Sequence, residues 1–338
     1  MQLLVGNPTA QSGKNARRID EARRLLSAAG IDHDFLATRP DGLTVPSVAR
    51  ALSGGAYTAV ISMGGDGTFA EVAKGLLASK ADIPMAMLPT GTANDQGKSF
   101  GMDSGESDLA RNVDIVAAGH TAPLDAGHIR AYGSVDQELG SDYFFDSAGW
   151  GFSARVLRMR NEDRRLVNGV PILRELYRDQ AVYAGAVLRA LMLTTVQETP
   201  FEAEVTTPAG TVFYEDLTDL ILKNTRIYAG MWVLDPTGSA EDGELDLVPF
   251  RGREELLVRG VIHHEQVPLH EPNLETVGLR LTPPTRSATF DIRLHARPLA
   301  EAPEAQIDGE EWIRAERYQV ETLRHAIRLV VPRELGGG

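Results

Sequence analysis

Cysteine is absent from all 338 residues, which excludes disulfide frameworks, thiolate metal sites and cysteine nucleophiles. Basic charge is in deficit, because 34 lysines and arginines face 47 aspartates and glutamates, for a formal net charge of −13. Nucleic-acid-binding proteins need a basic footprint, so we expect no nucleic-acid partner. Long apolar runs are also missing, since the nearest to a membrane span, residues 181–196, is too short and carries Arg189.

The N-terminal residues 1–8 lack a basic region and have only a short apolar run, so no signal peptide is expected. We therefore expect a cytoplasmic protein whose membrane contact, where there is one, is peripheral and on the inner face. A cluster of arginines precedes the apolar residues 181–193, and each could add about 1 kcal/mol on an anionic membrane surface. Its members are Arg155, Arg158, Arg160, Arg164 and Arg165, with Arg174 and Arg178 inside the expected helical stretch. The alternative is a solvated face followed by a buried helix.

The first third of the chain alternates strand and helix patterns. Strands are expected at residues 3–5, 31–38, 59–63 and 85–88, and helices at 16–29, 44–52 and 69–78. This rhythm predicts an α/β fold that begins with a doubly wound parallel sheet. From residue 123 the chain reads as strands and turns, including 143–147, with a helical stretch at 172–195, which predicts a mainly antiparallel β domain.

A glycine loop, Gly64-Gly65-Asp66-Gly67-Thr68, stands between an expected strand and an expected helix. Glycines allow the backbone to approach a phosphate, and a helix N-terminus points N–H groups at the anion. The carboxylate of Asp66 could hold Mg²⁺ on the phosphates. Thr68 and Glu71 also have the spacing of a capping box, so both could simply begin the helix.

A second loop, Leu-Pro-Thr-Gly-Thr-Ala-Asn-Asp over residues 88–95, follows the next strand. Ligands bind at the carboxyl ends of parallel strands, so its hydroxyl, amide and carboxylate groups are candidate ligand contacts. Any one of these residues could equally belong to a turn or cap a helix. The pairing of the two loops is therefore more informative than either loop alone.

Together, the first loop, Glu71 and residues 88–95 resemble the catalytic domain of the diacylglycerol kinase and sphingosine kinase family, and most closely its bacterial soluble members. Asn7-Pro8 and the segments 123–127, 224–246 and 307–310 resemble further elements of that family, in the expected order. Asp146 departs from the pattern, because Asn is more usual there. The resemblance implies an ATP- and Mg²⁺-dependent kinase that phosphorylates the hydroxyl of a diacylglycerol-like or sphingoid lipid.

The resemblance also implies roles for residues and domains. Residues 1–122 would bind ATP, residues 123–315 would bind the lipid, and residues 316–335 would return to the first domain. The implied ATP-binding residues are Asn7, Thr38, Gly65, Asp66, Gly67, Thr68, Glu71, Gly91, Thr92 and Asn94. Asp66, Asp95 and Asp125 would surround a catalytic Mg²⁺, and Asp308 would accept the proton of the lipid hydroxyl, although its setting also suits an ordinary turn.

A structural Mg²⁺ is implied at Ser239, Asp242 and Glu244, where an acidic turn is the alternative. Two rival functions stay open at this point: a kinase of a soluble alcohol such as NAD, and a non-catalytic protein that binds lipid or nucleotide on the same fold. The sequence leaves open which lipid is the substrate and whether the protein forms an oligomer.

Overall fold

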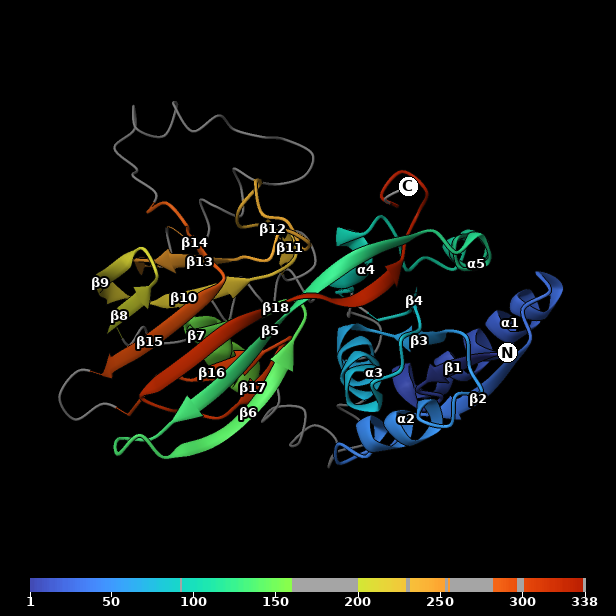
Figure 1. Cartoon of the computed structure of the whole chain (residues 1–338), viewed down its shortest axis with the longest axis horizontal. Helices are drawn as coiled ribbons and strands as arrows, with labels where there is room; N and C mark the ends of the chain where they lie inside the picture. The colour runs from blue at the N-terminus through green and yellow to red at the C-terminus, as the bar shows by residue number, and fades with distance from the viewer. Residues whose placement is uncertain are drawn as a thin grey trace, which may run out of the picture.

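The computed structural model describes residues 1–91, 93–159, 200–228, 232–252, 255, 282–296 and 301–336. Thr92, the three residues 160, 164 and 165 of the arginine cluster, and the helical stretch expected at 172–195 lie outside these residues. The described chain forms two lobes, a smaller one with most of the helices and a larger one built of strands (Figure 1).

The first lobe is built on four short parallel strands in the order β2-β1-β3-β4. Their bounds are β1 (Gln2–Gly6), β2 (His33–Ala37), β3 (Val60–Gly64) and β4 (Met85–Pro89). β3 and β4 are continuous apolar runs with nearly every residue buried, as strands covered on both faces require.

Helices cover both faces of this sheet. α2 (Thr44–Leu52) and α3 (Asp66–Ser79) bury Val48, Leu52 and Phe69 on one face. α1 (Lys14–Ala28) and α5 (Asp108–Ala118) bury their apolar sides on the other, and a short η1 (Ala10–Gly13) and α4 (Asp95–Ser99) complete the lobe. The predicted doubly wound domain is therefore confirmed.

The second lobe is a sandwich of mainly antiparallel strands. One sheet has the order β14-β13-β10-β7-β16-β17, and it packs on β5, β6, β8, β9, β15 and β18 through a core that contains Phe144, Trp150 and Tyr318. The strands are β5 (Thr121–Tyr132), β6 (Glu138–Phe144), β7 (Ser147–Gly151), β8 (Phe201–Thr207), β9 (Gly210–Leu217), β10 (Asp219–Lys223), β11 (Ile227–Tyr228), β12 (Trp232–Val233), β13 (Leu245–Phe250), β14 (Thr285–Ser287), β15 (Thr289–Ala296), β16 (Ala305–Ile307), β17 (Glu310–Trp312) and β18 (Arg317–Val330). The predicted antiparallel β domain is confirmed.

Two long strands, β5 and β18, run through both lobes as an antiparallel pair (Figure 1). The far end of β18 pairs with β4 in the first lobe, and its near end pairs with β15 in the second. A domain boundary at residue 122 therefore falls inside β5. The lobes are joined by continuous hydrogen-bonded strands, which restricts how far one can move against the other.

The single strand expected at residues 143–147 is wrong, because β6 ends at Phe144 and β7 begins at Ser147. The chain bends at Phe145 and Asp146, where backbone N–H groups donate to Asp308 instead of to a neighbouring strand. This bend lies at the candidate site described next.

Candidate active site

The carboxyl ends of β1, β3 and β4 meet at one edge of the parallel sheet. The chain connects β1 to β2 on one side and β3 to β4 on the other, so the strand order reverses between β1 and β3. In open α/β sheets, ligands bind beside such a reversal. Asn7 follows β1, Gly65 follows β3, and Thr90 follows β4 at this edge.

Asn7 and Thr38 shape the outer part of this edge. The Asn7 side-chain oxygen accepts hydrogen bonds from the Thr9 backbone N–H (3.0 Å) and from the Thr9 hydroxyl (2.8 Å), which closes a tight turn. The buried Asn15 amide donates to the Asn7 carbonyl (2.7 Å), and the Thr38 N–H donates to the Gly6 carbonyl (2.9 Å). Both predicted residues therefore lie at the ends of neighbouring strands, β1 and β2, and Asn7 lies beside the reversal.

The two glycine loops pack directly against each other. A Cβ atom on Gly91 would lie 2.5 Å from the Gly65 Cα, far inside van der Waals contact. The Thr90 N–H donates to the Gly64 carbonyl at 2.8 Å, and Asn94 exchanges two hydrogen bonds with Gly91 that close the second loop. Backbone contact thus requires glycine at position 91, a Cβ on Gly65 would be tight at 3.2 Å from the Gly91 Cα, and the Asn94 amide is occupied in holding the loop.

The first turn of α3 has no side-chain cap. The helix begins at Asp66, earlier than the expected Phe69, and its N-cap residue is Gly65. Thr68 lies inside the helix with its side chain against Gly64, and Glu71 contacts Thr44, so the capping-box alternative is wrong. The first helical hydrogen bond is made by the Phe69 N–H, which leaves the N–H groups of the exposed Gly67 and of Thr68 without helical partners.

Asp66 and Asp95 begin adjacent helices, α3 and α4. The Gln96 N–H at the start of α4 donates to the Asp66 carboxylate at 3.1 Å, which ties the two loops together. Burial, and then the nearby Asp146 charge, raise the pKa of Asp66. Carboxylates at this position suit Mg²⁺, which is commonly held by one or two carboxylates plus phosphate oxygens.

The donor set fits such an ion without forming a complete cage. No group of three or more His, Asp or Glu side chains gathers around a common point within the described residues. A cation at Asp66 and Asp95 would therefore depend on phosphate and water for its remaining ligands.

Asp308 lies in the turn between β16 and β17 with φ of 47°. Its carboxylate accepts backbone N–H groups from the bend after β6: Phe145 at 3.0 Å, Asp146 at 2.7 Å and Ser147 at 3.2 Å. Burial, and then the Asp146 charge, raise the pKa of Asp308 to about 7. Asp308 can therefore belong to a turn and also have the predicted role of a base, because the same N–H groups fix the turn and orient the carboxylate.

The Asp308 turn faces the first glycine loop. Glu310, two residues after Asp308, places a carboxylate oxygen 3.9 Å from the position of a Cβ atom on Gly67. The N-terminus of α3 and the β16–β17 turn, more than 200 residues apart in sequence, therefore form two sides of one site.

Lys223, which the sequence reasoning missed, forms a buried ion pair with Asp146. The Lys223 ammonium lies 2.6 Å from the Asp146 carboxylate and also donates to the Ile227 carbonyl at 2.9 Å. Both side chains are almost completely buried. The Asp that stands where Asn is more usual is thus paired with a lysine at the end of the apolar strand β10, and both residues are visible in the sequence.

Asp125 joins backbone segments of the two lobes. Its carboxylate accepts the N–H groups of Gly243 and His325, each at 2.6 Å, and its own N–H donates to the Ala240 carbonyl at 2.7 Å. Within the described residues no hydrogen bond links Asp125 to Asp66 or Asp95. Its contacts are those of a structural residue that fixes the 240–243 turn and the irregularity in β18.

The region of the expected structural Mg²⁺ is an acidic turn. Asp242 is exposed and accepts the Glu244 N–H at 3.0 Å, and the Ser239 hydroxyl accepts the Glu241 N–H at 3.4 Å. Arg286 pairs with Asp246 at 2.7 Å beside this turn and supplies positive charge to it. A metal at Asp242 stays a prediction.

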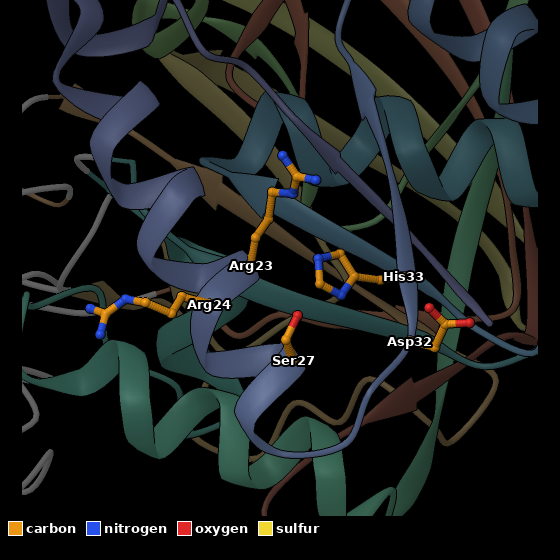
Figure 2. A pocket seen from close by; sticks show the side chains of 5 residues that line it. All are labelled: Arg23, Arg24, Ser27, Asp32 and His33. Carbon is orange, nitrogen blue, oxygen red and sulfur yellow. The ribbon is translucent and has the colours of Figure 1, made fainter.

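A shallow hollow lies at the opposite end of the first lobe, between the C-terminal half of α1 and the start of β2. Arg23, Ser27 and His33 gather there, whereas Arg24 points away from them (Figure 2). The hollow is remote from the carboxyl ends of the strands, so it is separate from the site that the glycine loops form.

Comparison with known proteins agrees with this geometry. Residues 2–129 match the family model of the diacylglycerol kinase catalytic domain. A diacylglycerol kinase of Staphylococcus carnosus is 25% identical over 245 residues, which cover 72% of this chain and 71% of that protein. The resemblance to the diacylglycerol kinase family is confirmed.

Two further matches show how much of the chain this similarity covers. A diacylglycerol kinase of Staphylococcus epidermidis is 28% identical over 153 residues, 45% of this chain, and the match spans less than half of that protein (44%). A solved diacylglycerol kinase structure from Bacillus anthracis has a TM-score of 0.69 at 20% identity, and the match covers 99% of this chain and 98% of that one. At that identity the structural match establishes the fold alone. In the described part of the chain, no helix is long and apolar enough to cross a membrane.

Proposed function

We propose that this protein transfers the γ-phosphoryl group of ATP to the hydroxyl of a diacylglycerol-like or sphingoid lipid, in the presence of Mg²⁺. The observation that carries the proposal is the pairing of an uncapped helix N-terminus, at Gly67 and Thr68, with the oriented Asp308 carboxylate on the facing lobe. The helix N-terminus suits the anionic phosphate donor, and the Asp308 carboxylate suits the hydroxyl of the acceptor.

The first lobe would hold the phosphates. Free N–H groups in the first turn of α3 donate to phosphate oxygens, and the helix dipole adds favourable charge. Gly65 and Gly91 pack backbone against backbone, and neither residue contributes a side chain to this surface. Asp66 and Asp95 would hold Mg²⁺, which neutralises charge on the phosphates during transfer.

The second lobe would supply the acceptor. Asp308 accepts the proton of the lipid hydroxyl through the carboxylate oxygen that carries fewer hydrogen bonds, while the other oxygen keeps the group in place. With a pKa of about 7, the carboxyl group is close to the value at which a base works best near neutral pH.

Gly67→Ala tests the donor side of the proposal. A Cβ atom there would meet nothing closer than 3.9 Å, and Ala favours helix over Gly by about 0.5–1 kcal/mol, so the fold should tolerate or gain from the change. The same Cβ would stand where phosphate must approach. We expect a protein of equal or higher melting temperature whose affinity for ATP, measured by calorimetry, is at least tenfold weaker; unchanged ATP affinity would remove the phosphates from this helix end.

A further inference from the structure

The face of α3 that looks toward the second lobe carries more than the glycine loop (Figure 1). Gly67, Glu71 and Lys74 are spaced four and three residues apart, so they share one face of the helix. Gly67 approaches Glu310, and the Lys74 ammonium lies 2.7 Å from the Asp142 carboxylate on β6. This ion pair connects the helix that would bind phosphate to the lobe that carries Asp308.

The geometry of Asp142 is fixed on both sides. One carboxylate oxygen accepts the Tyr143 N–H at 2.7 Å, and the other receives Lys74. The strand continues through Phe144 to the bend whose N–H groups hold Asp308. A second contact, between the rings of Phe69 on α3 and Phe145 in the bend (centroids 6.0 Å apart), lies alongside the ion pair.

Lys74 also acts on Asp308 through its charge. The charged groups around this point are Glu71 on α3, Asp142 on β6, Asp146 at the bend with its partner Lys223 on β10, and Glu310 on β17. Burial and then the Asp146 charge raise the pKa of Asp308, and the Lys74 charge lowers it by a smaller amount. The Lys74 side chain is 19% exposed.

We propose that Lys74 is a positioning residue for the phosphoryl transfer. Through Asp142 it holds the strand end whose N–H groups orient Asp308, and through its positive charge it favours the ionised form of that carboxylate. This inference rests on the proposed function, because it assigns Lys74 a part in the same reaction.

The test uses four variants of the full chain. Lys74→Met removes the ion pair and the charge, and Asp142→Asn removes the ion pair but keeps the lysine. The double variant Lys74→Asp with Asp142→Lys restores an ion pair with reversed signs, and Lys80→Asn, at the exposed end of the same helix, is the matched control. The pH dependence of kcat/KM for lipid phosphorylation is measured for each, together with the titration of Asp308 by carboxyl NMR.

Removing a positive charge should raise the pKa of Asp308. For Lys74→Met we expect the acid limb of the pH profile to move up by roughly half a pH unit, which is about a threefold loss of kcat/KM below pH 7. The reversed pair should move the acid limb at least as far, because it places a carboxylate near Asp308. Asp142→Asn should raise the KM for the lipid, and the reversed pair should return that KM to the wild-type value. Lys80→Asn should leave both quantities unchanged.

If the ion pair is purely structural, the reversed pair should show the wild-type pH profile. That profile would overturn the proposal. The NMR titration needs no turnover, so it tests the influence of Lys74 on Asp308 separately from the proposed lipid kinase function. If no lipid is phosphorylated but the Asp308 titration still moves in Lys74→Met, the proposed function fails and the influence of Lys74 on Asp308 stands. An unmoved titration overturns the role of Lys74 whatever the activity.

Discussion

Replacement of Gly91 by alanine tests the contact on which the site is built. The new Cβ atom would lie 2.5 Å from the Gly65 Cα and 2.9 Å from the Asn94 side-chain oxygen. Carbon atoms pack best at about 3.5–4.0 Å, so the loops must separate by about 1 Å. Gly91 does not adopt a left-handed conformation, so alanine meets no backbone strain of its own.

A displacement of this size is large for phosphoryl transfer. Misplacement of reacting groups by about 1 Å can cost on the order of 100-fold in rate, whereas overpacking costs about 1–3 kcal/mol of stability. We therefore expect Gly91→Ala to stay folded by circular dichroism and to lose about 100-fold in kcat/KM for ATP. Gly54→Ala is the matched control, because its Cβ would meet only the Ala51 carbonyl at 3.7 Å. Equal kcat/KM of the two variants would show that the contact between Gly65 and Gly91 does not position the site.

Three further predictions concern buried charges. Asp308→Asn keeps an acceptor for the surrounding N–H groups but removes the base, so we expect kcat to fall by about 10²–10⁴-fold while calorimetry finds ATP affinity nearly unchanged; substantial turnover would remove Asp308 from this role. Lys223→Met leaves Asp146 buried without its partner and should lower the free energy of unfolding in urea by about 3–5 kcal/mol, whereas adding Asp146→Asn should restore most of it. Burial raises the pKa of Asp219 to about 7, so the stability from this group is complete below its unfolded pKa and is lost as the pH rises through 7. Relative to Asp219→Asn, the wild-type protein should lose up to about 4 kcal/mol between pH 4 and 8 in urea titrations, and parallel curves would contradict this.

The first lobe could be predicted from the sequence because local patterns determine it. The apolar spacing of residues 44–52 gave the bounds of α2, and the buried runs before each glycine loop gave β3 and β4 to within a residue or so. The start of α3 was placed too late, because the side chains of Thr68 and Glu71 fit a capping box while the actual N-cap, Gly65, contributes only its backbone.

Features that depend on distant partners could not be predicted from the sequence. Residues 143–147 have the aromatic and apolar character of one strand, but Asp308, over 160 positions away, binds the N–H groups that create the bend. Lys74 and Asp142, 68 positions apart, likewise pair only because α3 meets β6. The nucleotide-binding and catalytic roles of the predicted residues stay predictions until they are measured.

Phosphoryl transfer from radiolabelled ATP measures the proposed lipid kinase activity itself. The purified chain is incubated with Mg²⁺ and, in parallel, with diacylglycerol, a sphingoid base or NAD, and each reaction is repeated with Asp308→Asn. We expect that label enters a lipid with the wild-type chain and that this transfer is nearly lost with the variant. Transfer to NAD alone, or transfer to no acceptor under any of these conditions, would contradict this expectation.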